Sequence, residues 1–190
     1  MRAYSFNKFI YDYVKKYDKN LAFKYRPEHI LELDQNAEYI EKSFKDFFED
    51  ILKLKMFFEK NKINKKHIAI FGRNSYPWSL IMSTVEVTDN ILVPLDKELQ
   101  YNETINCLER AEVDVIFYDS KFEEHILEVN KKMNLEIHSF DEIKEYIFKD
   151  NKEFNYENEL DKYIKEMNFL EDKFKEYEKT NGFEAIKNKY

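Results

Sequence analysis

The stretch that decides the fold is KKHIAIFGRNSYPW at residues 65–78, with ILVPLDKEL at residues 91–99 and VDVIF at residues 113–117. Each contains a short apolar run of the length typical of a buried strand. Helical patterns lie between these runs, at about residues 76–88 and 102–111. This order predicts parallel strands joined by right-handed crossovers and covered by helices. We therefore predict an α/β fold with a doubly wound, mostly parallel sheet flanked by helices.

Upstream of this stretch, the sequence predicts a helix and two short extended segments. Apolar residues recur at helical spacing through residues 5–18, and residues 21–25 read as a strand that ends before Pro27. Residues 30–33 could pair with residues 37–40 across a polar turn, which predicts a hairpin.

A long helix follows the hairpin. Ser43 and Asp46 have the spacing of a capping box, in which each side chain bonds to the other residue's backbone N–H. A broad apolar stripe continues from there to about Asn61. We predict a helix that begins after Ser43 and packs on the core.

Downstream, the pattern predicts a helix at residues 121–132, a strand at residues 135–138 and a helix from about Asp141. The expected organisation is a domain at residues 1–140 and a charged, amphipathic helical extension at residues 141–190.

Charge and hydropathy exclude several classes of partner. The 190 residues carry a formal net charge of −7, which disfavours a nucleic-acid backbone as the partner. No apolar run reaches the roughly 20 residues that a membrane-spanning helix needs. The single cysteine, Cys107, excludes an internal disulfide, and no signal peptide is apparent at the N-terminus. We expect a cytoplasmic protein.

Glycine is scarce, and this limits the chemistry that the chain can perform. The two glycines are Gly72 and Gly182, more than a hundred residues apart. Neither a Walker-type phosphate loop nor a dinucleotide fingerprint can be built from them, because both need closely spaced glycines.

The central stretch resembles the opening subdomain of the adenylate-forming (AMP-binding) superfamily, which includes the long-chain acyl-CoA synthetases. Members have a strand, a Gly-x-Asn-Ser-x-x-Trp segment, a helix and a Val-Pro-Leu-Asp strand end, which match residues 72–78 and 93–96. The similarity covers about residues 4–140. One departure is at residues 88–90, Thr-Asp-Asn, where relatives often have glycine; Asp and Asn tolerate turn conformations.

The resemblance implies activation of a carboxylate with ATP and Mg²⁺ and transfer of the acyl group to coenzyme A. The family's phosphate loop, adenine segment, ribose-binding pair and C-terminal lysine find no match in this chain. Where the phosphate loop should follow, residues 157–190 are a charged helical stretch. We therefore expect no catalytic, cofactor-binding or metal-binding residue, and a chain truncated before the phosphate-loop motif.

Polar residues at the expected carboxyl edge of the sheet allow a ligand-binding or a structural interpretation. The segment from Gly72 to Ser75 precedes a helix, at the edge where open α/β sheets bind ligands. The structural interpretation is stronger: Ser75 or Asn74 caps the helix and Arg73 is solvated. Asp96 and Asp119 end the next two strands, where turn or capping roles explain them.

The remaining reactive side chains form no recognisable site. The four histidines lie far apart in the sequence, at His29, His67, His125 and His138, and Cys107 stands alone in a helical pattern. None has the paired spacing of metal ligands or of a nucleophile and its base.

The tail has a seam of apolar residues at alternating spacings of three and four, over residues 157–179. The seam residues are Leu160, Tyr163, Met167, Leu170, Phe174 and Tyr177. This pattern predicts a helix that packs along another helix, either on its own domain, on a second copy or on a second polypeptide.

Three functions remain open. The first is a truncated or degenerate acyl-CoA synthetase-like protein that is inactive alone. The second is one subunit of a split adenylate-forming enzyme that a second chain completes. The third is a non-catalytic interaction module that uses the tail helix.

Overall fold

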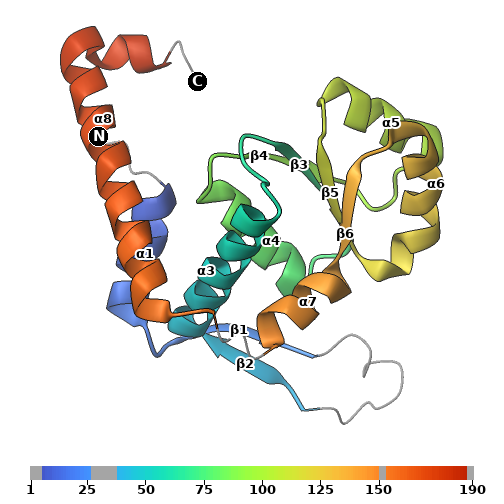
Figure 1. Cartoon of the computed structure of the whole chain (residues 1–190), viewed down its shortest axis with the longest axis horizontal. Coiled ribbons are helices and arrows are strands. Elements are labelled where there is room, and N and C mark those ends of the chain that lie inside the picture. Colours follow the sequence, from blue (N-terminus) through green and yellow to red (C-terminus); the bar gives the residue numbers. More distant parts are fainter. Residues whose placement is uncertain (1–5, 27–37, 150–152, 188–190) are drawn as a thin grey trace.

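The computed structural model describes residues 6–26, 38–149 and 153–187, with side chains described through residue 176. Figure 1 shows a sheet with helices on both faces and a long helix along one side. In chain order the helices are α1 (Phe6–Tyr17), α3 (Phe44–Lys60), α4 (Tyr76–Glu86), α5 (Tyr101–Arg110), α6 (Glu123–Met133), α7 (Phe140–Phe148) and α8 (Tyr156–Lys187). The strands are β1 (Leu21–Tyr25), β2 (Ile40–Ser43), β3 (His67–Phe71), β4 (Ile91–Leu95), β5 (Val115–Tyr118) and β6 (Glu136–Ser139). One short 3₁₀ helix, η1, spans Ser120–Phe122.

The main sheet has four parallel strands in the order β4-β3-β5-β6. β3 and β5 are central, and β4 and β6 lie at the two edges. This arrangement confirms the predicted α/β fold class, because each strand is followed by a helix before the next parallel strand begins.

Alternating side chains of the central strands enter two separate cores. Ile68 and Ile70 belong to the cluster shared with α3, α4 and α7, whereas Ala69 and Phe71 belong to the cluster beneath α5 and α6. Successive side chains of a strand point to opposite faces, so a strand covered on both sides must be apolar throughout. This explains the continuous apolar runs in the sequence.

β1 and β2 form a separate antiparallel pair, in which Tyr25 lies opposite Ile40. The strand predicted at residues 21–25 is confirmed. The hairpin predicted between residues 30–33 and 37–40 lies mostly outside the described residues, since residues 27–37 are not described. The described strand at residues 40–43 pairs with β1.

The capping box of α3 is confirmed. The Ser43 hydroxyl accepts a hydrogen bond from the Asp46 N–H at 3.1 Å, and the Asp46 carboxylate accepts one from the Ser43 N–H at 2.9 Å. The helix ends at Lys60 with Asn61 as its C-cap, as the sequence predicts. Ten of its residues are buried, so α3 is the helix around which the larger core is built.

The first part of α8 packs on α1 and α3. Tyr163 is fully buried; its hydroxyl donates a hydrogen bond to the Asn7 carbonyl at 2.8 Å, and its ring meets Phe48 edge to face. Lys55 binds Glu166 at 2.7 Å. The tail seam therefore contacts its own domain at this level, whereas the Leu170 side chain farther along is 49% exposed. The domain division at residue 140 stays a prediction.

The turn before β4 is closed by a side chain. Asn90 accepts a hydrogen bond from the Lys66 N–H at 2.9 Å and donates one to the Thr88 hydroxyl at 2.9 Å. None of residues 88–90 has a positive φ, so this turn does not need glycine. The prediction that Asp and Asn are tolerated here is confirmed.

Candidate functional site

The loop between β3 and α4 lies at the carboxyl edge of the main sheet. Ser75 is the N-cap of α4 and accepts a hydrogen bond from the Trp78 N–H at 3.4 Å. Pro77 occupies the first turn, where its missing N–H costs nothing. The predicted capping role of Ser75 is confirmed, and the end of this helix is occupied by its own chain.

Gly72 permits β3 and β5 to approach each other closely where they end. A Cβ at residue 72 would lie 2.6 Å from the Asp119 Cβ and 3.0 Å from the Phe140 ring. The first distance is far inside van der Waals contact, so any larger residue would push the strand ends apart. The glycine of the Gly-x-Asn-Ser segment thus has a packing role in this chain.

Arg73 and Asp119 form a bidentate ion pair between the loops that follow β3 and β5. The arginine Nε lies 2.6 Å and its Nη2 3.2 Å from the two carboxylate oxygens. The Asp119 side chain is 3% exposed and the Arg73 side chain 31% exposed. The prediction that Arg73 is solvated is therefore wrong, because a buried carboxylate requires a cation partner.

Asp119 also has the turn role that the sequence predicts. Its carboxylate accepts a hydrogen bond from the Lys121 N–H at 3.1 Å and caps the 3₁₀ helix η1. Burial raises the pKa of Asp119, but the hydrogen bonds from Arg73 and Lys121 outweigh burial and hold the pKa below its usual range. Asp119 is therefore ionised at neutral pH.

An open hollow of about 600 Å³ lies between the loop after β3 and the end of β4. Gly72, Asn74, Trp78, Pro94, Leu95, Asp96 and Lys97 line it. The structure thus brings the Gly72–Ser75 loop together with Asp96. Asp119 is not among the lining residues; it is paired with Arg73.

The lining of the hollow includes one aromatic residue, Trp78, and a mixed pair of charges. Lys97 is its cation, and it is paired with Glu98. The Asp96 carboxylate accepts a hydrogen bond from the Glu98 N–H at 2.9 Å, which confirms its predicted turn role. A polyphosphate needs several cations or converging amides. This lining suits a small apolar or weakly polar group better than a nucleotide.

A second polar cluster is buried between α3, α4 and the β1–β2 pair. The Asp50 carboxylate accepts hydrogen bonds from the Tyr76 hydroxyl at 2.6 Å and from Lys42 at 2.7 Å. Burial, and then the charge of Asp50, raise the pKa of Tyr76 well above its usual range. The ring of Tyr25 stacks on Tyr76 at 4.6 Å, and burial raises the pKa of Tyr25 to about 12.

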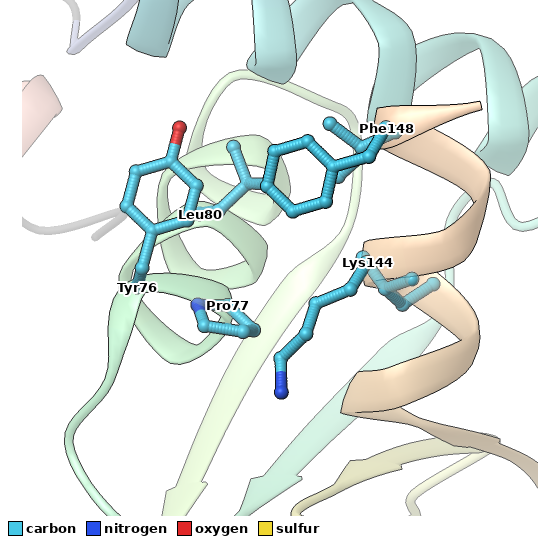
Figure 2. Close-up of a pocket in the computed structure, with 7 residues that line it drawn as sticks. Tyr76, Pro77, Leu80, Lys144 and Phe148 are labelled. Carbon is cyan, nitrogen blue, oxygen red and sulfur yellow. The ribbon is translucent and has the colours of Figure 1, made fainter. Parts of the chain in front are cut away.

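The gap beside this cluster is too small for a ligand. Figure 2 shows Phe148 from α7 lying against Leu80 and near Tyr76, with Lys144 extending past Pro77. The gap has a volume of about 10 Å³, roughly that of one water molecule. Among the described residues, the Asp50 cluster therefore joins the layers of the fold, and the gap beside it has no room for a ligand.

The described histidines have structural partners. His138 lies between the rings of Phe57 and Phe117, and His125 stacks on Phe71. Within the described residues, no group of three or more His, Cys, Asp or Glu side chains could hold a metal ion. His29 lies outside the described part of the chain. No described helix is long and apolar enough to cross a membrane.

Comparison with known proteins identifies the fold through solved structures. No family model and no curated protein matches the sequence. The crystal structure of VinN matches 77% of this chain with a TM-score of 0.63 and 10% identity. ATP-bound MatB from Rhodopseudomonas palustris matches 79% with a TM-score of 0.62 and 11% identity. The Klebsiella oxytoca NpsA N-terminal subdomain matches 79% with a TM-score of 0.55 and 12% identity.

These structures are adenylate-forming enzymes, and at such low identity they establish the fold alone. The chain has an adenylate-forming ligase-like α/β fold. It spans 36% of the VinN chain, 29% of the MatB chain and 34% of the NpsA chain. About two thirds of each of these chains has no counterpart in the residues that match.

Proposed function

We propose that this chain is a partial, adenylate-forming ligase-like protein of the cytoplasm that forms no acyl-adenylate on its own. The ancestral reaction would be ATP-dependent ligation of a fatty acid to coenzyme A, in keeping with the resemblance to long-chain acyl-CoA synthetases. One observation carries this proposal. The carboxyl edge of the sheet, where α/β folds bind nucleotides, has the paired Lys97 as the cation of its hollow and a self-capped helix end.

The energetic reason is the charge on the leaving pyrophosphate. Adenylation needs several oriented donors or cations there, and removal of one such group commonly costs about 3 kcal/mol in the transition state. Arg73 cannot supply one, because it neutralises the buried Asp119 carboxylate. A chain with two glycines also cannot form a glycine-rich phosphate loop.

The test is isothermal titration of the purified chain with ATP and Mg²⁺, with and without a long-chain fatty acid, together with an ATP–pyrophosphate exchange assay. We expect no binding heat and no exchange from folded protein. Micromolar ATP binding or measurable exchange would overturn the proposal.

A second candidate is a split enzyme, in which another polypeptide supplies the phosphate loop and the mobile domain. The coverage of the structural neighbours supports it, since the matched region is about a third of each of their chains. Mixing this chain with a candidate complement should then restore pyrophosphate exchange. If both proteins are folded but do not associate, and the mixture shows no pyrophosphate exchange, the split-enzyme proposal is contradicted.

A third candidate is an interaction module that uses the helix at residues 157–179. Phe169 is 58% exposed and Leu170 is 49% exposed on α8, beyond the part that packs on the domain. Figure 1 shows this end of α8 extending past the other helices. A complex formed through this helix should be lost in the double variant Leu170→Glu and Phe174→Glu and kept in Lys165→Glu, an exposed change on the same helix.

A further inference from the structure

β4 has the composition of an interior strand but lies at an edge of the sheet. Its sequence is ILVPL, with no charged residue, whereas the opposite edge strand, β6, is EIHS. Edge strands are commonly protected from pairing by charged side chains, as Glu136 does for β6. Pro94 is the only residue of β4 with a protective effect, because it removes one N–H from the strand.

Two of the side chains of β4 are exposed, as expected of a strand whose outer side can bind a partner. Ile91 is 55% exposed and Pro94 is also exposed, whereas every residue of β5 is buried. In the described part of the chain, β3 is the only strand beside β4. The outer side of β4 therefore offers both backbone groups and apolar side chains.

The hydrogen bonds to β3 determine which backbone groups point outward. The Ile91 N–H donates to the Lys66 carbonyl at 2.9 Å, and the parallel register continues from this pair to Leu95. Alternation along a strand then turns Ile91, Val93 and Leu95 toward β3. The outward groups are the N–H and the carbonyl of Leu92 and the carbonyl of Pro94.

We propose that β4 pairs antiparallel with β4 of a second copy of this chain, across a two-fold axis at Leu92. The Leu92 N–H and carbonyl would exchange two hydrogen bonds with the same groups of the second copy. Pro94 disfavours the register in which it would itself lie on the axis. A pair of prolines at the axis would form neither bond, whereas an axis at Leu92 places each Pro94 carbonyl opposite the Asn90 N–H of the other copy.

The side chains match in this register. Exposed Ile91 lies opposite Val93 of the second copy, and the two Leu92 side chains face each other, so the cross-strand contacts are apolar. The partner's turn at residues 88–90 would also lie beside Pro94 at the rim of the hollow.

The test is the oligomeric state, measured by sedimentation velocity over a wide range of protein concentration. We expect a reversible dimer. The variant Ile91→Lys places a charge on an already exposed side chain at the edge and should shift the protein to monomer, with an unchanged far-UV circular dichroism spectrum. Leu127→Lys is the matched control, since Leu127 is 46% exposed on α6, and it should remain dimeric.

A cysteine experiment tests the register itself. In a Cys107→Ser background, Ile91→Cys and Val93→Cys chains are mixed and oxidised. In the mixture, we expect a disulfide bond that links an Ile91→Cys chain to a Val93→Cys chain, because residue 91 faces residue 93 across the axis. Each variant oxidised by itself should form few disulfide-linked dimers. A wild-type monomer at every concentration overturns the proposal. A dimer that survives Ile91→Lys but is lost in Leu170→Glu also overturns it and assigns the contact to α8. Neither result bears on whether the chain binds ATP.

Discussion

Arg73 and Asp119 lie 46 residues apart in the sequence, yet their side chains are joined by two hydrogen bonds of 2.6 and 3.2 Å. The pair ties the loop after β3 to the loop after β5. Because Asp119 is almost fully buried, the pair is part of the structure of the sheet edge, and its removal should be measurable as a loss of stability.

Replacing Asp119 by alanine should lower the free energy of unfolding by about 3 kcal/mol, because it leaves a partly buried guanidinium without its partner. Urea unfolding followed by circular dichroism measures the change. Asp96→Ala is the control: it removes an exposed carboxylate from the same edge and should cost no more than about 1 kcal/mol. Equal effects of the two changes would contradict a special role for the pair.

The Arg73–Asp119 pair also predicts how the stability of the protein depends on pH. The pKa of Asp119 is lower in the folded protein than in the unfolded chain, where it is about 3.9. The stabilisation is therefore fully present above the unfolded pKa and is lost as pH falls through the folded pKa. The stability difference between wild type and Asp119→Asn should be constant from neutral pH to about pH 5 and should shrink at lower pH. A difference that grows on acidification would contradict the assigned sign.

Gly72→Ala should destabilise the protein by about 1–3 kcal/mol, because its Cβ would overlap the Asp119 Cβ. Thermal unfolding at fixed pH is the measurement. Asn74→Ala, at the exposed tip of the same loop, should stay within about 0.5 kcal/mol of wild type. If Gly72→Ala does not change the stability of the protein, the strand ends can separate without a loss of free energy of unfolding.

The two stacked tyrosines should respond differently to loss of their hydroxyls. Tyr76→Phe removes a hydrogen bond from the buried Asp50 and should cost about 1–3 kcal/mol. The Tyr25 hydroxyl is buried without a hydrogen-bond partner among the described residues, so Tyr25→Phe should be neutral or slightly stabilising. Chemical denaturation of both variants under one set of conditions decides the comparison. A larger loss for Tyr25→Phe would show that its hydroxyl has a partner in solution.

Tyr163→Ala should cost about 3–5 kcal/mol, because it opens a cavity against Phe48 and removes the bond to Asn7. Phe169→Ala, on the exposed side of the same helix, should change the free energy of unfolding by less than about 0.5 kcal/mol. Similar losses in the two variants would indicate that α8 packs differently in solution.

The regular elements could be predicted because their signals are local. The capping box from Ser43 to Asp46 spans four residues, and the apolar run of β3 is readable in five. The strand, helix, strand order then restricts the sheet to parallel topologies, so the fold class follows from short-range patterns.

The contacts that define the candidate site could not be predicted in this way. Arg73 meets Asp119, and Tyr76 meets Asp50, only after strands and helices have packed, and neither pair leaves a periodic signal in the sequence. The one usable hint was Gly72, since a glycine at the end of a central strand often marks a close approach of two backbones. The pairing of β2 with β1 was likewise hidden, because it depends on a connection of fourteen residues between Tyr25 and Ile40.

The bond between Tyr163 and Asn7 has a consequence for the order of events during synthesis on the ribosome. All four strands of the main sheet end by Ser139, so the sheet can assemble while α8 is still being translated. Helix α1, although translated before the sheet, obtains its Tyr163 contact only after more than 150 further residues have emerged. Contacts of such long sequence separation form late in folding, because loop closure must precede them. The sheet can therefore form on the nascent chain while one flank of α1 stays uncovered until α8 leaves the exit tunnel.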